Sequence, residues 1–173
     1  MATYTKGFKK KNSEQALLLT IVGIIGAVLL IVGAVFIYDL ATDTGSYDDF
    51  EHIEAYDSIL VNVDDQNVAY QDYLVYFYSD DCSNCIEIKR DVLKLSEKIN
   101  GEEKIVFFVN ASTVKETVTG DKAEFLDDVN LSSIRTPMLV SVVNGEFLES
   151  FTGTTNVLQV LEEVESGTYT PFN

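Results

Sequence analysis

The fold is decided by the stretch Tyr73-Leu-Val-Tyr-Phe-Tyr-Ser-Asp-Asp-Cys82-Ser-Asn-Cys85-Ile-Glu-Ile-Lys-Arg-Asp-Val92, which holds the only two cysteines of the chain. Its first part, residues 73–78, is rich in aromatic and β-branched residues and has few polar residues on either face. That pattern predicts a strand covered on both sides. A strand that delivers a Cys-x-x-Cys to the first turn of a helix makes a dithiol that can open and close as a disulfide.

The residues after the pair show helical periodicity. Apolar residues spaced by three, four, three and four positions form one stripe of a helix, and they are Cys85, Ile88, Val92, Leu95 and Ile99. Charged residues stand between them, and Asn100-Gly101 supplies a stop signal. The stripe therefore predicts that Cys85 is buried and that Cys82 lies at the helix start, near solvent.

This placement predicts different roles for the two cysteines. Free amide donors and the helix dipole favour a thiolate at Cys82, the expected attacking group, and Cys85 would then resolve the mixed disulfide. A structural disulfide is disfavoured because so small a loop removes little entropy from the unfolded chain. A zinc site is disfavoured because zinc needs about four ligands, whereas the chain offers two cysteines and one histidine, His52. Two free buried cysteines remain an alternative.

The rest of the domain reads as alternating strands and helices. The expected elements are a short helix at 51–58, strands at 59–63 and 104–109, a polar loop at 111–121 and a helix at 122–129. They are followed by a hairpin of strands 137–143 and 146–151 around Asn144-Gly145, and by a last amphipathic helix after Gly153.

Residues 16–38 form a run of 23 residues without a charge. At ~1.5 Å per residue, such a helix is long enough to cross a hydrocarbon core of ~30 Å. A cleaved signal peptide is the competing interpretation, but its apolar core would be shorter and no good cleavage site follows. We therefore expect a cytoplasmic basic tail at 1–15, a transmembrane helix at 16–38, a stalk at 39–49 and an extracytoplasmic domain at 50–173.

The charge distribution agrees with that topology. Residues 1–38 carry four lysines and one glutamate, a net of +3, and the remainder carries 27 acidic and eight basic residues, a net of −19. The lysines before the span place the N-terminus in the cytoplasm. Such an acidic domain is a poor candidate for binding nucleic acid or an anionic membrane surface.

The order of these features resembles the thioredoxin superfamily over roughly residues 50–165. Thr136-Pro137 stands where that family carries a cis-proline facing the active-site disulfide. The resemblance implies an α/β, thioredoxin-like fold, a central mixed sheet flanked by helices. It also implies a substrate chain that pairs in extended form with the backbone around Thr136, which makes Thr136 and Pro137 candidate substrate-binding residues. Arg135 is a third candidate, although it would serve equally as a surface charge that offsets the local acids.

The sequence also departs from that family. Asp81 precedes the first cysteine where many members have tryptophan, and Tyr76 occupies the position of an aspartate that relays protons to the second cysteine. The middle pair Ser83-Asn84 matches neither reducing nor strongly oxidising members. Glu87 is a candidate to replace this proton relay. The alternative is that Glu87 is an ordinary surface glutamate.

Negative charge around the motif gives a first testable prediction. Asp80, Asp81 and Glu87 oppose the effect of the helix terminus on Cys82. We expect the thiol pKa of Cys82 to lie above about 5, in contrast to strongly oxidising dithiols. Thiolate absorbance measured against pH tests this, and a lower pKa would contradict it.

The expected protein is a membrane-anchored thiol-disulfide oxidoreductase, of a type suited to a Gram-positive bacterium. It would need no cofactor and no metal, and would exchange with protein thiols and disulfides of exported proteins and with a membrane redox partner. One alternative is a non-catalytic thioredoxin-fold adaptor for protein or peptide export, of the bacteriocin-accessory type. Another is metal delivery by Cys82, Cys85 and His52.

Overall fold

The computed structural model describes residues 13–42, 45–60, 70–101 and 105–172. The chain divides into two compact units, Met1–Asp43 and Thr44–Asn173. The first contains the helix α1, Ser13–Thr42. Within it, Leu17–Val35 is a 19-residue apolar window, none of which is buried. By length and composition, α1 is therefore able to cross a membrane.

The second unit is built on a four-stranded mixed sheet. Its strands are β1 (Tyr73–Tyr78), β2 (Ile105–Asn110), β3 (Met138–Val143) and β4 (Glu146–Thr152), in the spatial order β2-β1-β3-β4. The central strand β1 is parallel to β2 and antiparallel to β3. The hairpin β3–β4 turns at Asn144 and Gly145, whose φ angles of 54° and 76° are those that an Asn-Gly turn requires.

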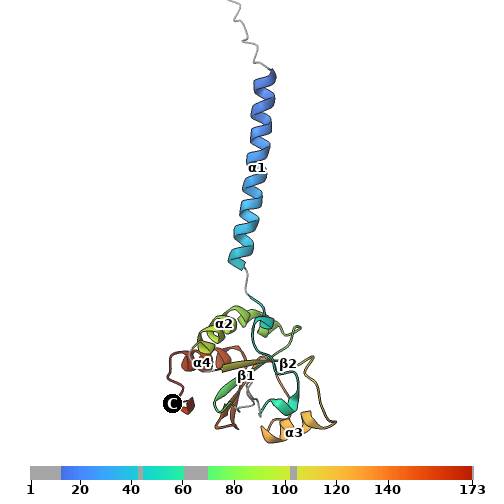
Figure 1. Cartoon of the computed structure of the whole chain (residues 1–173), viewed down its shortest axis with the longest axis vertical. Helices are drawn as coiled ribbons and strands as arrows, with labels where there is room; N and C mark the ends of the chain where they lie inside the picture. The colour runs from blue at the N-terminus through green and yellow to red at the C-terminus, as the bar shows by residue number, and fades with distance from the viewer. Residues whose placement is uncertain (1–12, 43–44, 61–69, 102–104, 173) are drawn as a thin grey trace, which may run out of the picture. The chain divides into compact units, whose positions relative to one another are not determined.

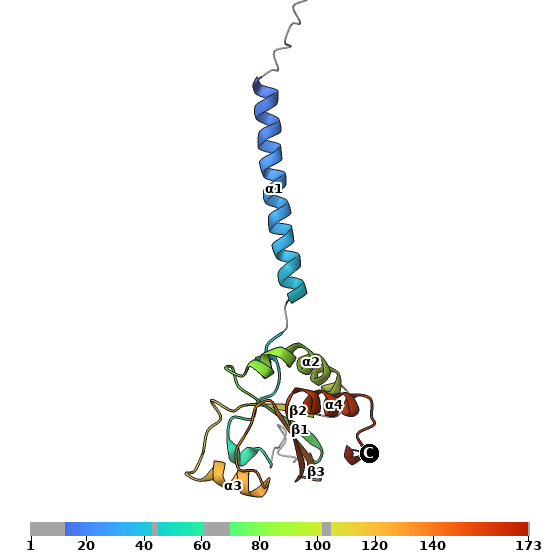
Figure 2. The ribbon, with the colours of Figure 1, turned by 180° about the vertical axis from the view of Figure 1, so that it is seen from behind.

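Helices cover both faces of this sheet. The helices α2 (Ser83–Asn100) and α4 (Thr154–Glu165) pack against each other on one face. The short helix α3 (Asp121–Asp128) contacts the turn η2 (Tyr56–Ser58) on the opposite face, as Figures 1 and 2 show. Two further single turns are η1 (Tyr47–Asp49) and η3 (Thr170–Phe172). A β1-α2-β2 unit, followed by α3, a hairpin and α4, is the thioredoxin-like arrangement, so the expected fold class is confirmed.

The alternation of side chains along β1 explains why its sequence has no polar face. Leu74, Tyr76 and Tyr78 belong to the core under α2 and α4, whereas Tyr73, Val75 and Phe77 belong to the core on the α3 side. All six are buried. A central strand between two layers of helix needs apolar residues at every position.

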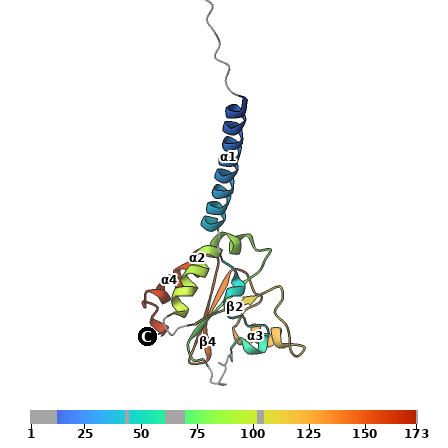
Figure 3. The ribbon, with the colours of Figure 1, turned by 45° about the horizontal axis from the view of Figure 1, so that its top comes forward.

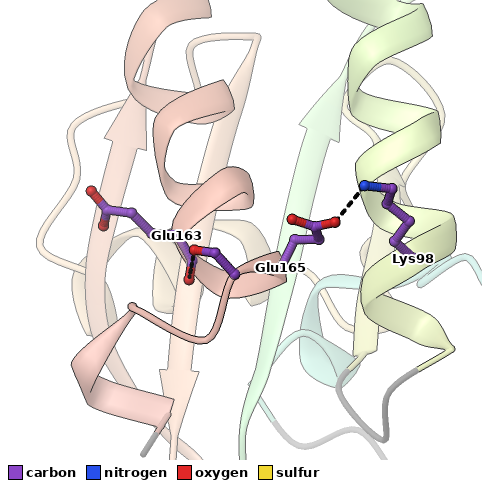
Figure 4. Close-up of polar contacts among 4 residues, drawn as sticks. Lys98, Glu163 and Glu165 are labelled. Atoms are coloured by element: carbon purple, nitrogen blue, oxygen red, sulfur yellow. Dashed lines mark hydrogen bonds and ion pairs between the residues drawn. The ribbon is translucent and has the colours of Figure 1, made fainter.

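One ion pair joins α2 to α4. Figure 4 shows Lys98 of α2 donating to Glu165 near the end of α4, while Glu163 points elsewhere. Exposed pairs of this kind contribute at most about 1 kcal/mol. The two helices lie side by side in Figure 3 as well. Both contribute buried apolar side chains to the same core, among them Val92, Ile99, Leu161 and Val164.

Two predictions for the segment before β1 were wrong. Residues 51–55 do not form a helix but run extended along the outer edge of β2, where the Ile53 amide donates to the Phe108 carbonyl at 2.9 Å. The unpaired backbone groups of that edge account for the extended conformation, because they bond the passing chain. Only η2 is helical. Ile59 and Leu60 lie in a bend rather than a strand, and the rest of the expected strand lies outside the described residues.

Candidate functional site

The two cysteines lie at the start of α2 and form a disulfide. Cys82 is the N-cap residue, and its Sγ accepts the Cys85 amide hydrogen with an N···S distance of 3.0 Å. A tight turn delivers it there, because the Cys82 amide donates to the Ser79 carbonyl just after β1. The Cα atoms of the pair are 5.2 Å apart, within the ordinary range for a disulfide.

The exposure of the two cysteines differs as the helical stripe predicts. Cys85 is 1% exposed and belongs to the core between the sheet and α2, whereas Cys82 is half-buried. Only the sulfur of Cys82 is therefore open to an external thiol or disulfide. A backbone N–H that donates to this sulfur also favours a thiolate there. The geometry suits attack by Cys82 and resolution by Cys85.

The predicted substrate-binding residues, Arg135, Thr136 and Pro137, lie at the end of the sheet from which the dithiol also extends. Phe77, near the end of β1, pairs with Met138, the first residue of β3. Cys82 comes shortly after the end of β1, and Pro137 comes directly before the start of β3. Because these two strand ends are paired, the cysteine and the proline leave the sheet at the same end. The Thr136–Pro137 peptide bond is cis. Pro137 is buried, Thr136 is half-buried and Arg135 is exposed. Their role toward a substrate stays a prediction.

Acidic side chains surround the motif at the surface. Asp80, Asp81 and Glu87 are all exposed, and the Asp80 carboxylate accepts a hydrogen bond from the side-chain amide of Asn110 at 3.0 Å. Glu87 thus has the position of a surface residue rather than that of a buried proton relay.

A group of three tyrosines behind Cys85 was not expected from the sequence. Tyr47, Tyr76 and Tyr78 are all buried in the core that contains Cys85. The ring centroids of Tyr47 and Tyr78 are 4.0 Å apart, and those of Tyr47 and Tyr76 are 5.9 Å apart. The Tyr47 hydroxyl donates to the Cys85 carbonyl at 3.2 Å. The sequence predicted the strand that contains Tyr76 and Tyr78. Tyr47, in contrast, belongs to residues 39–49, which were interpreted as a stalk.

Burial keeps these hydroxyls protonated. It raises the pKa of Tyr76 well above its ordinary value, and the neighbouring Tyr47 adds to that effect. Burial, followed by the charges of Asp80 and Asp48, raises the pKa of Tyr78 to about 12. Burial likewise raises the pKa of Tyr47. At neutral pH all three hydroxyls therefore keep their protons, and none is a base.

The Tyr76 hydroxyl gives a prediction about stability. It is buried and makes no hydrogen bond of ordinary geometry with the described residues, although the Tyr47 hydroxyl lies close enough to raise its pKa. An unpaired buried hydroxyl costs about 1–3 kcal/mol, so Tyr76→Phe should raise the free energy of unfolding by about 1 kcal/mol. Urea unfolding of the oxidised protein measures this. A destabilised variant would show that the hydroxyl has a partner.

His52 uses both of its ring nitrogens. Nδ1 lies 2.9 Å from the Phe50 carbonyl, to which it must donate, so Nε2 of the neutral ring accepts from the Tyr78 hydroxyl at 3.0 Å. The described residues contain no group of three or more side chains placed to hold a metal ion. The structure therefore does not bring His52 together with the cysteines as the metal-delivery alternative requires.

Comparison with solved structures finds thioredoxins. Thioredoxin 3 of Saccharomyces cerevisiae mitochondria, in its oxidised form, is 12% identical, with a TM-score of 0.49 over 71% of this chain and 99% of that chain. Thioredoxin from Trypanosoma brucei brucei is 13% identical, with a TM-score of 0.47 over 70% and 96% of the two chains. Thioredoxin O2 from Arabidopsis thaliana is 20% identical, with a TM-score of 0.46 over 69% and 94%.

No family model and no curated protein matches the sequence. Because the TM-scores of these thioredoxins are below 0.5, the assignment of the fold rests on the strand order and connections described above.

Proposed function

We propose that this protein is a thiol-disulfide oxidoreductase that acts through Cys82 and Cys85. One observation carries the proposal: the disulfide lies at the N-terminus of α2 with one sulfur half-buried and the other enclosed. A structural cross-link gains little from closing a loop this small, whereas a redox pair needs one accessible sulfur and one resolving sulfur close behind it.

The reductive cycle begins with both cysteines as thiols. The Cys82 thiolate attacks one sulfur of a substrate disulfide, forms a mixed disulfide and releases the other substrate sulfur as a thiolate, which takes up a proton. The Cys85 thiol then loses its proton to solvent and attacks the Cys82 sulfur. The second substrate thiolate leaves, and the Cys82–Cys85 disulfide forms. Run in reverse, the same steps oxidise a substrate dithiol.

We propose that the substrates are exported proteins and that α1 anchors the domain outside the membrane of a Gram-positive cell. The apolar window of α1, the lysines before it and the acidic domain after it support this topology. Because Cys82 and Cys85 are the only thiols, a membrane-impermeant maleimide reports their side directly. Labelling of reduced intact cells is expected, and labelling only after lysis would place the domain inside.

Insulin reduction by the full chain in mild detergent, with dithiothreitol as electron donor, tests the activity. The proposal predicts catalysed precipitation of the insulin B chain. An export adaptor of the same fold would bind its partners without any turnover in this assay.

We further propose that electrons pass between the dithiol and a membrane redox partner. Such a partner would set whether the protein reduces or oxidises its substrates in the cell.

A further inference from the structure

Tyr47 reaches the redox site from a segment that follows α1 in the sequence. Residues 45–50 are held by local bonds: the Asp48 amide donates to the Ser46 hydroxyl at 3.2 Å, and the Ser46 amide donates to the Asp49 carboxylate at 3.0 Å. These reciprocal bonds form a capping box around η1. They fix the turn that carries the Tyr47 side chain into the core, where it is 8% exposed.

The Tyr47 ring is held by its surroundings. Its centroid lies 4.0 Å from that of Tyr78 and 5.6 Å from that of Phe108, and the Lys89 ammonium lies 5.1 Å from it. Aromatic pairs at such separations and a cation near a ring are each favourable contacts. Lys89 also belongs to α2, so Tyr47 contacts this helix both at its first turn and one turn later.

The Tyr47 hydroxyl, placed in this way, donates to the carbonyl of Cys85 at 3.2 Å. A carbonyl oxygen has two lone pairs, so it accepts this bond in addition to its bond within the helix. The bond is buried and joins residues 38 positions apart. It therefore ties the backbone of the more buried cysteine to a part of the fold outside α2.

We propose that Tyr47 is a positioning residue for the redox reaction, in that its hydroxyl holds Cys85 within reach of Cys82 after the disulfide has opened. This inference rests on the proposed function. While the disulfide is closed, the covalent bond itself holds the two residues together. Once it is reduced, the first turn of α2 keeps its place through noncovalent bonds, and the bond from Tyr47 is one that reaches Cys85 from outside α2. The segment 45–50 is thus part of the redox site.

The test uses the oxidation of the reduced full chain by glutathione disulfide, which separates two steps. In the first, the Cys82 thiolate attacks glutathione disulfide, giving a glutathione mixed disulfide and one glutathione thiolate. In the second, the Cys85 thiolate attacks the Cys82 sulfur and expels the second glutathione thiolate. Acid quenching and mass spectrometry follow the mixed disulfide, so both rate constants come from one experiment.

Tyr47→Phe keeps the ring and removes only the hydroxyl. We expect the second step to slow by about fivefold, the effect of losing one ordinary hydrogen bond, while the first step, which involves Cys82 alone, stays unchanged. Tyr73→Phe is the matched control, because the Tyr73 hydroxyl also donates to a backbone carbonyl, that of Ile59, at 3.0 Å, and belongs to the core on the other face of the sheet. It should leave both steps unchanged.

Equal second-step rates in wild type and Tyr47→Phe would overturn the inference, as would an equal loss in Tyr73→Phe. Hydrogen exchange gives an independent readout: in the reduced proteins, amides of residues 86–89 should exchange faster in Tyr47→Phe than in the wild type, and equal exchange would also overturn the inference. The proposed function fails separately, if the wild type does not catalyse insulin reduction; the exchange comparison still decides on Tyr47 in that case.

Discussion

Cys82→Ser is expected to lower insulin reduction to the uncatalysed rate. The Cys82 sulfur is the half-buried one of the pair, whereas Cys85 is 1% exposed and cannot meet a protein disulfide. A serine hydroxyl in place of the Cys82 sulfur is not a nucleophile toward disulfides at neutral pH, since the thiolate is the reactive form. Turnover measured by insulin precipitation should therefore vanish.

Cys85→Ser provides the matched control, because it removes the other sulfur of the same pair. It leaves the first attack intact, so mixed disulfides with substrate should accumulate and be visible on non-reducing gels. If Cys82→Ser kept its turnover, or if neither variant formed mixed disulfides, the roles assigned to the two cysteines would be wrong. An absence of turnover in the wild type as well would favour an adaptor function, which tolerates Cys82→Ser.

Phe108→Ala should destabilise the domain by about 3–5 kcal/mol, the usual cost of removing a buried phenylalanine ring. Phe108 lies on β2 with no exposed surface, and its ring centroid is 4.7 Å from that of Phe50 and 5.6 Å from that of Tyr76. Its backbone also bonds the extended segment at Glu51 and Ile53. Since domains have stabilities of about 5–15 kcal/mol, at least about a fifth of the folding free energy would be lost.

Urea unfolding of the oxidised protein, followed by circular dichroism, measures this loss. Val118→Ala serves as the control, because Val118 is 66% exposed, and exposed substitutions change stability by about 0.5 kcal/mol or less. A loss below about 1 kcal/mol in Phe108→Ala would show that the aromatic core behind the dithiol is not packed as described.

The elements that the sequence predicted well are those in which the pattern reflects burial directly. β1 is apolar throughout because it lies between two layers of helix, and it was predicted with its observed bounds, Tyr73–Tyr78. The stripe of α2 placed Cys85 in the core because a helix against a sheet buries one face. Leu93 and Ser96, which lie outside that stripe, are also buried. The α4 helix covers part of this face of α2, which widens the buried surface beyond one stripe.

The features that were missed depend on contacts distant in the sequence. The segment at Ile53 has helical spacing, yet it is extended because the edge of β2 supplies backbone partners more than 50 positions away. Tyr47 stands among acidic and small residues that resemble a stalk, and nothing local indicates its bond to Cys85. The pair of cysteines and their different burial could thus be predicted, whereas the tyrosines that surround the second cysteine could not.

The redox equilibrium of the Cys82–Cys85 couple with glutathione tests the central claim most directly. The full chain is equilibrated over a range of ratios of reduced to oxidised glutathione, and the fraction of disulfide is measured by trapping free thiols. A redox-active pair is expected to titrate reversibly, with a potential between about −270 mV, at the reducing end, and about −120 mV, at the oxidising end. A pair that glutathione does not open, with a potential below about −300 mV, would be a structural disulfide and would contradict the account.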